Sequence, residues 1–219
     1  MSTQILDFRK IDLSKIEYSN PTKTKGSYVS NITYNGNDIY IQTPLLKNNI
    51  EINTLDSRAF LELVFEEPNM NFYEFISNFD DANMLKIHKS SFEWFNKEFP
   101  LDVVEDFYSG SLKHKNNPKL KIKFNKNESC FIYDKNQKIM NKIHKDCYVI
   151  CILKFNGFKF LSQQVISEWV PVQIKTDYEL DLEEHTKNYL ITEDIYNENT
   201  NSENTENTEN TENTENTEN

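Results

Sequence analysis

The sequence has few of the residues from which phosphate-binding loops and catalytic motifs are built. Only four of its 219 residues are glycines, and no segment matches a glycine-rich loop that binds phosphates or dinucleotides. The H-E-x-x-H zinc motif and the G-x-S-x-G nucleophile motif are also absent. The four histidines, at positions 88, 114, 144 and 185, show no spacing that would pair them in a site. We therefore expect no enzyme activity and no cofactor.

Long apolar runs are missing as well. The longest, Tyr148–Leu153, has six residues, whereas a transmembrane helix needs about 20. The N-terminal segment is polar and lacks the hydrophobic stretch of a signal peptide. The three cysteines are an odd number, which favours reduced thiols in an intracellular protein. We expect no membrane partner.

Cys147, Cys151 and His144 lie close enough in the sequence to be considered as metal ligands. If residues 147–155 form a strand, however, two positions four apart lie about 13 Å from each other. Zinc ligands lie about 2.0–2.3 Å from the ion. We interpret the cysteines as small core residues and predict no metal site.

The chain has fewer basic than acidic residues, and this acidic excess is confined to its C-terminal part. The net charge is -11; from Asp177 onward there are 14 acidic residues and one lysine, which gives -13. Residues 1–176 hold the other 21 acids and 23 bases, which gives +2. Residues 197–219 contain only Asn, Glu, Thr and one Ser. With no apolar group to bury, such a segment is expected to be disordered.

The first half of the chain predicts strands followed by a helix. β-Rich arms flank Asn35-Gly36 within residues 26–44, a pattern typical of a hairpin with a tight type I′ turn. Residues 59–65 alternate apolar and polar side chains, which predicts another strand. Residues 69–99 then favour an amphipathic helix, or two helices joined at Asp80-Asp81, where the carboxylates would cap the second. Residues 100–110 add a short helical turn.

After Gly110 the pattern returns to strands, at residues 118–124, 129–134, 147–155 and 158–175. A second Asn-Gly pair, Asn156-Gly157, is expected to turn the chain between the last two. Six or seven short strands with one helical insert fit a mainly β, antiparallel barrel or sandwich better than a parallel α/β fold. The predicted organisation is an irregular lead-in at residues 1–25, a β domain at residues 26–176 and a disordered acidic tail at residues 177–219.

One stretch concentrates positive charge. Residues 113–145 contain ten lysines and two acids, a local balance of +8. Along the strand near position 120, Lys119, Lys121 and Lys123 face one side, whereas Leu120 and Ile122 face the core. A basic sheet face that also carries aromatic rings is the surface that single-stranded nucleic acid uses. The alternative interpretation is a solvated strand face whose lysines prevent edge-to-edge aggregation.

Several blocks, taken in order, are similar to single-stranded-DNA-binding proteins of nucleocytoplasmic large DNA viruses, whose barrel resembles the OB-fold proteins of short-tailed phages. The similarity covers residues 26–175. Its blocks are GSYVSNITYNGNDIYIQTPLL, SSFEWFNKEF, VVEDFYSGSLKHKNNPKLKIKF, IYDKNQKI and VICILKFNGFKFLSQQVISEWVPVQIK.

The resemblance implies an OB-fold-like barrel that binds single-stranded DNA without catalysis or strict sequence preference, in viral DNA replication, recombination or repair. It also implies an acidic tail that recruits a polymerase or helicase, in a viral factory or the nucleus of the host cell; we also consider a homodimer. The alternatives are a virion assembly protein and an RNA-binding barrel. The expected binding residues are the lysines Lys113, Lys115, Lys119, Lys121, Lys123 and Lys159 and the rings Tyr133, Phe158 and Phe160. The rings are expected to stack on bases, and strand alternation places Phe158 and Phe160 on one face. The alternative for the aromatic rings of this last hairpin is that they belong to the core.

Overall fold

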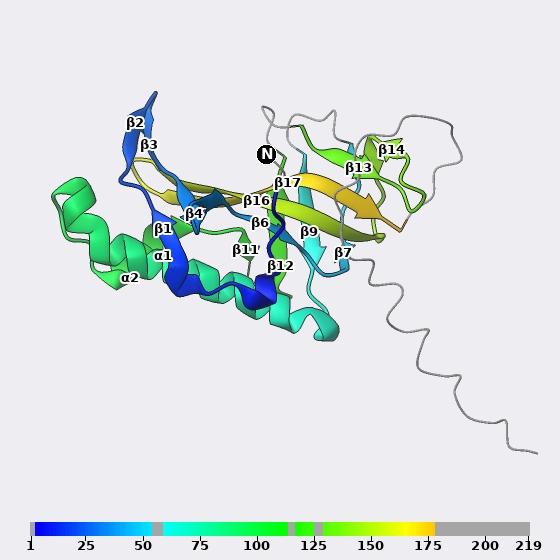
Figure 1. The fold of residues 1–219 in the computed structure, drawn as a ribbon, viewed down its shortest axis with the longest axis horizontal. Coiled ribbons are helices and arrows are strands. Elements are labelled where there is room, and N and C mark those ends of the chain that lie inside the picture. Colours follow the sequence, from blue (N-terminus) through cyan, green and yellow to red (C-terminus); the bar gives the residue numbers. More distant parts are fainter. Residues whose placement is uncertain (1–2, 54–58, 114–116, 125–128, 178–219) are drawn as a thin grey trace, which may run out of the picture.

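More of the described chain lies in strands than in helices, and one long helix interrupts the strands (Figure 1). The computed structural model describes residues 3–53, 59–113, 117–124 and 129–177. The helices are α1 (Met70–Phe95) and α2 (Leu101–Phe107), with 3-10 turns η1 (Phe8–Lys10), η2 (Leu13–Lys15) and η3 (Glu67–Asn69). Neither α-helix combines the length and the apolar character that crossing a bilayer requires, as far as the described residues go.

The strands, in chain order, are β1 (Ile16–Tyr18), β2 (Thr22–Thr24), β3 (Ser27–Ser30), β4 (Ile32–Tyr34), β5 (Asn37–Asp38), β6 (Tyr40–Gln42), β7 (Leu46–Asn48), β8 (Ile52–Asn53), β9 (Phe60–Val64), β10 (Tyr108–Ser109), β11 (Leu112–Lys113), β12 (Lys119–Lys123), β13 (Phe131–Tyr133), β14 (Ile139–Met140), β15 (Lys142–Ile143), β16 (Tyr148–Phe160) and β17 (Val165–Thr176).

The main sheet curls into a barrel. Its strands follow the order β11-β12-β9-β7-β16-β17-β13-β14, and β10 pairs in parallel with β17. Strands β10 and β11 are separated by only two residues; β10 pairs with β17, and β11 pairs with β12. Together with contacts between β12 and β17, they close the sheet. The predicted fold class, an OB-fold-like mainly β barrel with a helical insert, is confirmed. The predicted tail lies outside the described residues, apart from Asp177.

The β16–β17 hairpin is the longest antiparallel pair and connects the two ends of the molecule (Figure 1). We expected its turn at Asn156-Gly157, and this is wrong: β16 continues through these residues, and the chain turns at residues 161–164. Gly157 lies at a shift in the β16–β17 register, with φ +82°. A Cβ atom there would collide with the carbonyl oxygen of Ser30. Glycine at this position therefore permits a bulge and the close approach of β3, and does not form a turn.

The first Asn-Gly pair does form a turn, as predicted. Asn35 and Gly36 have φ values of 50° and 74°, and they join β4 to β5. The expected irregular lead-in is wrong in part, because β1 pairs with β4 and β2 pairs with β3. Strands at the start of the chain thus complete hairpins whose other halves lie in the predicted domain.

Helix α1 is a single uninterrupted helix. One face of the helix packs on the barrel, where Phe72, Phe79 and Ile87 are fully buried, whereas Met70, Leu85 and Phe92 on other faces are exposed. The helix ends at Asn96, which adopts a left-handed conformation (φ 53°) and donates its N–H to the Phe92 carbonyl at 2.8 Å. The predicted helix cap at Asp80-Asp81 is wrong, since both residues lie in the middle of α1. The predicted short helix after Pro100 is confirmed as α2.

The core is built from aromatic rings packed between α1 and the sheet. Phe79, Phe155 and Trp169 form a triangle with ring centroids 4.8–5.1 Å apart. Cys147 and Cys151 are buried in this region of apolar packing and Cys130 is half-buried against it. The interpretation of the cysteines as core residues is confirmed.

Candidate nucleic-acid interface

A row of lysine side chains covers the outer face of two neighbouring strands. Lys119, Lys121 and Lys123 alternate along β12 with Leu120 and Ile122, which are fully buried. This alternation confirms the side-chain pattern predicted from the sequence. On β11, Lys113 stands directly opposite Lys119 in the antiparallel register. We call Lys113, Lys119, Lys121 and Lys123 the lysine row; Lys115 lies outside the described residues.

Strand β9 supplies one acidic partner to the lysine row. Glu62 lies opposite Lys121 in the register, and its Oε1 is 2.7 Å from the Lys119 ammonium. Asn49 Nδ2 donates to the same oxygen at 2.9 Å. The hydrogen bond from Lys119, followed by that from Asn49, lowers the pKa of Glu62 below its ordinary value. Glu62 is therefore ionised at neutral pH and partly neutralises one end of the row.

An aromatic ring from β9 lies beside the lysine row. The ammonium of Lys121 is 3.8 Å from the centre of the Phe60 ring, a cation–π contact. Phe60 pairs with Lys123 in the β9–β12 register and is half-buried. Phe60 and Glu62 were not among the site residues predicted from the sequence. Alternation within residues 59–65 already put both on the face opposite Leu61 and Leu63, but only the β9–β12 pairing shows that this face meets the lysines.

The ammonium groups of the row are close enough to repel one another. Burial is the main cause that lowers the pKa of Lys113, and the charges of Lys121 and Lys123 lower it further, whereas Asp80 opposes the shift. Lys113 donates to the Gly110 carbonyl oxygen at 3.0 Å. A bound anion would relieve this repulsion, which is why a row of like charges is suited to a phosphate backbone.

The predicted stacking rings lie elsewhere. Tyr133, Phe158 and Phe160 are all buried, with at most 8% of their surface exposed, so the prediction that they stack on bases is wrong. Phe158 and Phe160 do share a face, but that face packs inward: Phe158 stacks on Tyr18, and Phe160 contacts Trp94 and Phe95 of α1.

Lys159 points the opposite way and is exposed, as alternation requires. It lies opposite Val29 of β3 and Ile166 of β17. In the sheet order, β7 and β9 separate its strand from β12. The structure thus does not bring Lys159 into the lysine row.

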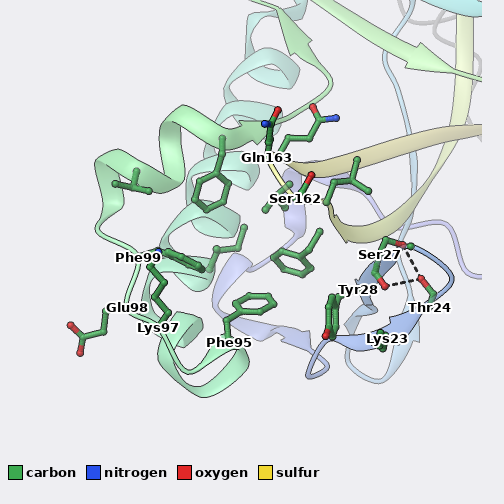
Figure 2. Close-up of a pocket in the computed structure, with 18 of the residues that line it drawn as sticks. Lys23, Thr24, Ser27, Tyr28, Phe95, Lys97, Glu98, Phe99, Ser162 and Gln163 are labelled. Atoms are coloured by element: carbon green, nitrogen blue, oxygen red, sulfur yellow. Dashed lines mark hydrogen bonds between the residues drawn. The ribbon is translucent and has the colours of Figure 1, made fainter.

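A pocket of about 600 Å³ lies at the turn of the β16–β17 hairpin, beside residues 160–165 (Figure 2). Rings and aliphatic side chains line most of it, including Phe95, Phe99 and Phe160, with Lys23 and Lys97 at its edge. We call it the hairpin-tip pocket. No motif in the sequence indicated it, because its walls come from three segments distant in the chain, at residues 23–28, 87–107 and 160–165. Within the described residues, no cluster of His, Cys, Asp and Glu side chains could hold a metal ion.

Comparison with known families gives a match over most of the chain. Residues 48–193 match a family described as "Family of unknown function (DUF5871)". The chain belongs to this family. The matched range of the DUF5871 chain includes the whole lysine row, Phe60 and Glu62, and most of the hairpin-tip pocket. A search of curated proteins gives no match.

The DUF5871 chain is also similar to solved structures of phage proteins. The single-stranded DNA-binding protein from bacteriophage Enc34 aligns with a TM-score of 0.44 at 8% identity, covering 74% of this chain and 90% of the phage chain. The same phage protein in complex with ssDNA gives 0.43 and 6%, covering 75% and 97%. The gp2.5 single-stranded DNA-binding protein of bacteriophage T7 gives 0.45 and 9%, covering 67% and 98%.

Proposed function

We propose that this DUF5871 protein binds single-stranded DNA along the lysine row, without catalysis and with little sequence preference. The observation that supports this is the placing of four lysines on one face of paired strands, beside an aromatic ring. Lysines neutralise phosphates regardless of sequence, and any base offers a face that can stack on a ring.

Contacts within the row suggest how phosphate and base are bound together. In the unbound protein, the Lys121 ammonium covers the Phe60 ring. A phosphate draws the ammonium outward because the charge–charge attraction exceeds a cation–π contact of about 0.5–1 kcal/mol. The ring is then uncovered, and an adjacent base stacks on it. In this mechanism one lysine movement serves both contacts.

The acidic tail is proposed to compete with DNA for the lysine row. It carries -13 from Asp177 onward, whereas residues 1–176 carry +2. A segment tethered this closely acts at an effective concentration near millimolar, so weak contacts are enough. DNA displaces the tail, which then becomes available to a polymerase or helicase. The sequence resemblance favours a role in viral DNA replication, recombination or repair, in the compartment where the viral genome is copied.

A salt titration with a fluorescent oligothymidylate tests the proposed function. Binding is expected to weaken with a log–log slope of about -0.7 for each phosphate contacted, hence about -2 to -3 for three or four lysines. RNA and duplex DNA of equal length are run in parallel, and tighter binding to RNA would favour the RNA-binding alternative. Absence of single-strand binding at about 0.15 M salt would favour the assembly protein instead.

A further inference from the structure

The hairpin-tip pocket is an apolar cavity left open on the surface of the described chain. Its floor is formed by Ile87, Phe160 and Val165, which are at least nine-tenths buried. Tyr28 and Val103 at its edge are 42% and 41% exposed. Pockets of about 300–1,000 Å³ with such walls are the ones that bind apolar side chains or small ligands.

The lysines at the edge of the hairpin-tip pocket favour an occupant that carries negative charge. Lys23 and Lys97 line it on opposite sides, and in Figure 2 the Glu98 carboxylate points away from the cavity. The remaining polar groups at the edge, such as Gln163 and Ser162, are neutral. An occupant with apolar side chains in the cavity and acidic neighbours at the edge is therefore complementary.

We propose that the occupant is a segment of the chain's own tail, with Tyr189, Leu190 and Ile191 inserted in the hairpin-tip pocket. These three residues form the longest apolar run after Thr176. Glu193 and Asp194 follow the run closely, whereas Lys187 lies between the run and the preceding pair Glu183 and Glu184. The apolar run and the acidic pair that follows it thus have the groups that the pocket and its edge require.

The length of the intervening chain is sufficient for the same run to reach the pocket. Strand β17 begins at Val165, which lines the hairpin-tip pocket, and ends at Thr176. Its twelve residues span at most about 40 Å at 3.3 Å per residue. A tail that leaves from Asp177 needs about twelve extended residues to return over that distance. Tyr189 is twelve residues past Asp177 and can cover the whole of this distance, whereas Leu182, five residues past Asp177, can cover about 18 Å at most.

The family match provides an independent indication. It continues to residue 193, sixteen residues past Asp177, and it stops before the Glu-Asn-Thr repeats. Residues 178–193 therefore belong to the unit that the family shares, together with α1, α2 and the β16–β17 hairpin. This is expected if the segment has a place on the folded body.

A nucleobase is a weaker candidate for the same pocket. Its ring would stack on Phe95 or Phe99, but its polar edge would meet the aliphatic floor of Ile87 and Val165. Buried polar groups without a hydrogen-bond partner are costly. We therefore favour the tail segment and treat the base as an outcome of the test.

Disulfide trapping in the full chain tests the proposal directly. Val103→Cys at the exposed edge of the hairpin-tip pocket is combined with Leu190→Cys, or with the control Leu182→Cys. Mild oxidation is expected to crosslink the first pair within one chain, seen as a faster-migrating monomer on a non-reducing gel, and to leave the control at least ten-fold less crosslinked. Equal crosslinking of both pairs, or none in the first, overturns the proposal. A crosslinked dimer alone would show that a second copy supplies the segment, which also overturns it.

Hydrogen exchange provides a second measurement that needs no new thiol. Replacing Tyr189, Leu190 and Ile191 by serine in the full chain is expected to speed exchange in residues 161–165 several-fold. Replacing Tyr178, Leu180 and Leu182 by serine is the matched control and should leave that region unchanged. If only added oligothymidylate protects the pocket, in both variants alike, the occupant is a base and the proposal is wrong. Neither crosslinking nor the DNA-free exchange depends on DNA binding, so this proposal can fail while the proposed function holds.

Discussion

At the scale of single residues, the buried Asp80 in α1 is the most consequential titratable group. Burial raises its pKa from 3.8 to about 6, although the Tyr108 hydroxyl donates to it at 2.7 Å and opposes the shift. The folded protein therefore holds this proton more tightly than the unfolded chain does. The resulting stabilisation is complete below about pH 4 and is lost as the pH rises through about 6.

We expect Asp80→Asn to stabilise the protein at pH 7.5 by about 1–3 kcal/mol, because a shift of about two pKa units corresponds to roughly 3 kcal/mol. The amide oxygen can still accept the Tyr108 hydroxyl. Urea denaturation at pH 7.5 and pH 4 measures the gain, which should vanish at the lower pH. The control is Asp81→Asn, whose side chain is exposed and should matter by less than about 0.5 kcal/mol. An equal gain at both pH values would contradict the assignment.

Gly36 and Gly157 show two different reasons for glycine: a positive φ alone at Gly36, and a positive φ together with a close backbone contact at Gly157. Both have positive φ, at +74° and +82°, but only at Gly157 would a Cβ meet backbone, the carbonyl of Ser30. Gly36→Ala should cost about 1 kcal/mol from φ strain alone. Gly157→Ala should cost at least about 1 kcal/mol more, because β3 must move away from β16. Thermal unfolding of both variants measures the difference; equal losses would show that β3 moves without cost.

At the scale of elements, the paired strands β9 and β12 should carry DNA affinity. Lys121→Gln with Lys123→Gln is expected to reduce the salt slope by about 1.4, since each lost phosphate contact removes about 0.7. Lys10→Gln is the control, as this lysine is highly exposed and lies in η1.

Phe60→Leu should weaken binding by about 1–3 kcal/mol through lost stacking, with the slope unchanged. Glu62→Gln should strengthen binding, because Lys119 is released from its ion pair. If the double lysine variant, the Lys10→Gln control, Phe60→Leu and Glu62→Gln all change the DNA affinity equally, the lysine row is only a solvated strand face.

The same elements show what local sequence can predict. Alternation correctly predicted which side chains of β12 face the core: Leu120 and Ile122 are buried, and the lysines that alternate with them lie on the opposite face. It also placed Phe158 and Phe160 on one face of β16, but it could not show that α1 covers that face. Asn156-Gly157 matched a turn because Asn-Gly tolerates positive φ, and a bulge next to β3 uses the same tolerance. The deciding contacts in each failure come from residues more than 60 positions away.

At the scale of the whole molecule, the distribution of charge separates the folded body from its tail. Composition alone predicts a disordered tail, because a run of Glu, Asn and Thr has nothing to bury; that prediction falls outside the described residues. Composition could not predict the hairpin-tip pocket, because the pocket exists only where β2–β3, the end of α1, α2 and the hairpin turn meet. In our two proposals the tail regulates the surface of the folded body, because it binds at the lysine row and in the hairpin-tip pocket.

Neutralising the repeats tests that regulation while keeping the chain length. Six glutamates occupy every third position from Glu203 to Glu218, and replacing all six by glutamine removes six negative charges. We expect single-stranded DNA to bind several-fold more tightly at about 50 mM salt, because competition for the lysine row is weakened. At about 0.5 M salt the difference should vanish, since the Debye length is then well under 10 Å. Fluorescence anisotropy with labelled oligothymidylate measures both affinities. If the affinity is the same at low salt, the repeats do not compete with DNA, and the polar run serves only to keep the protein soluble.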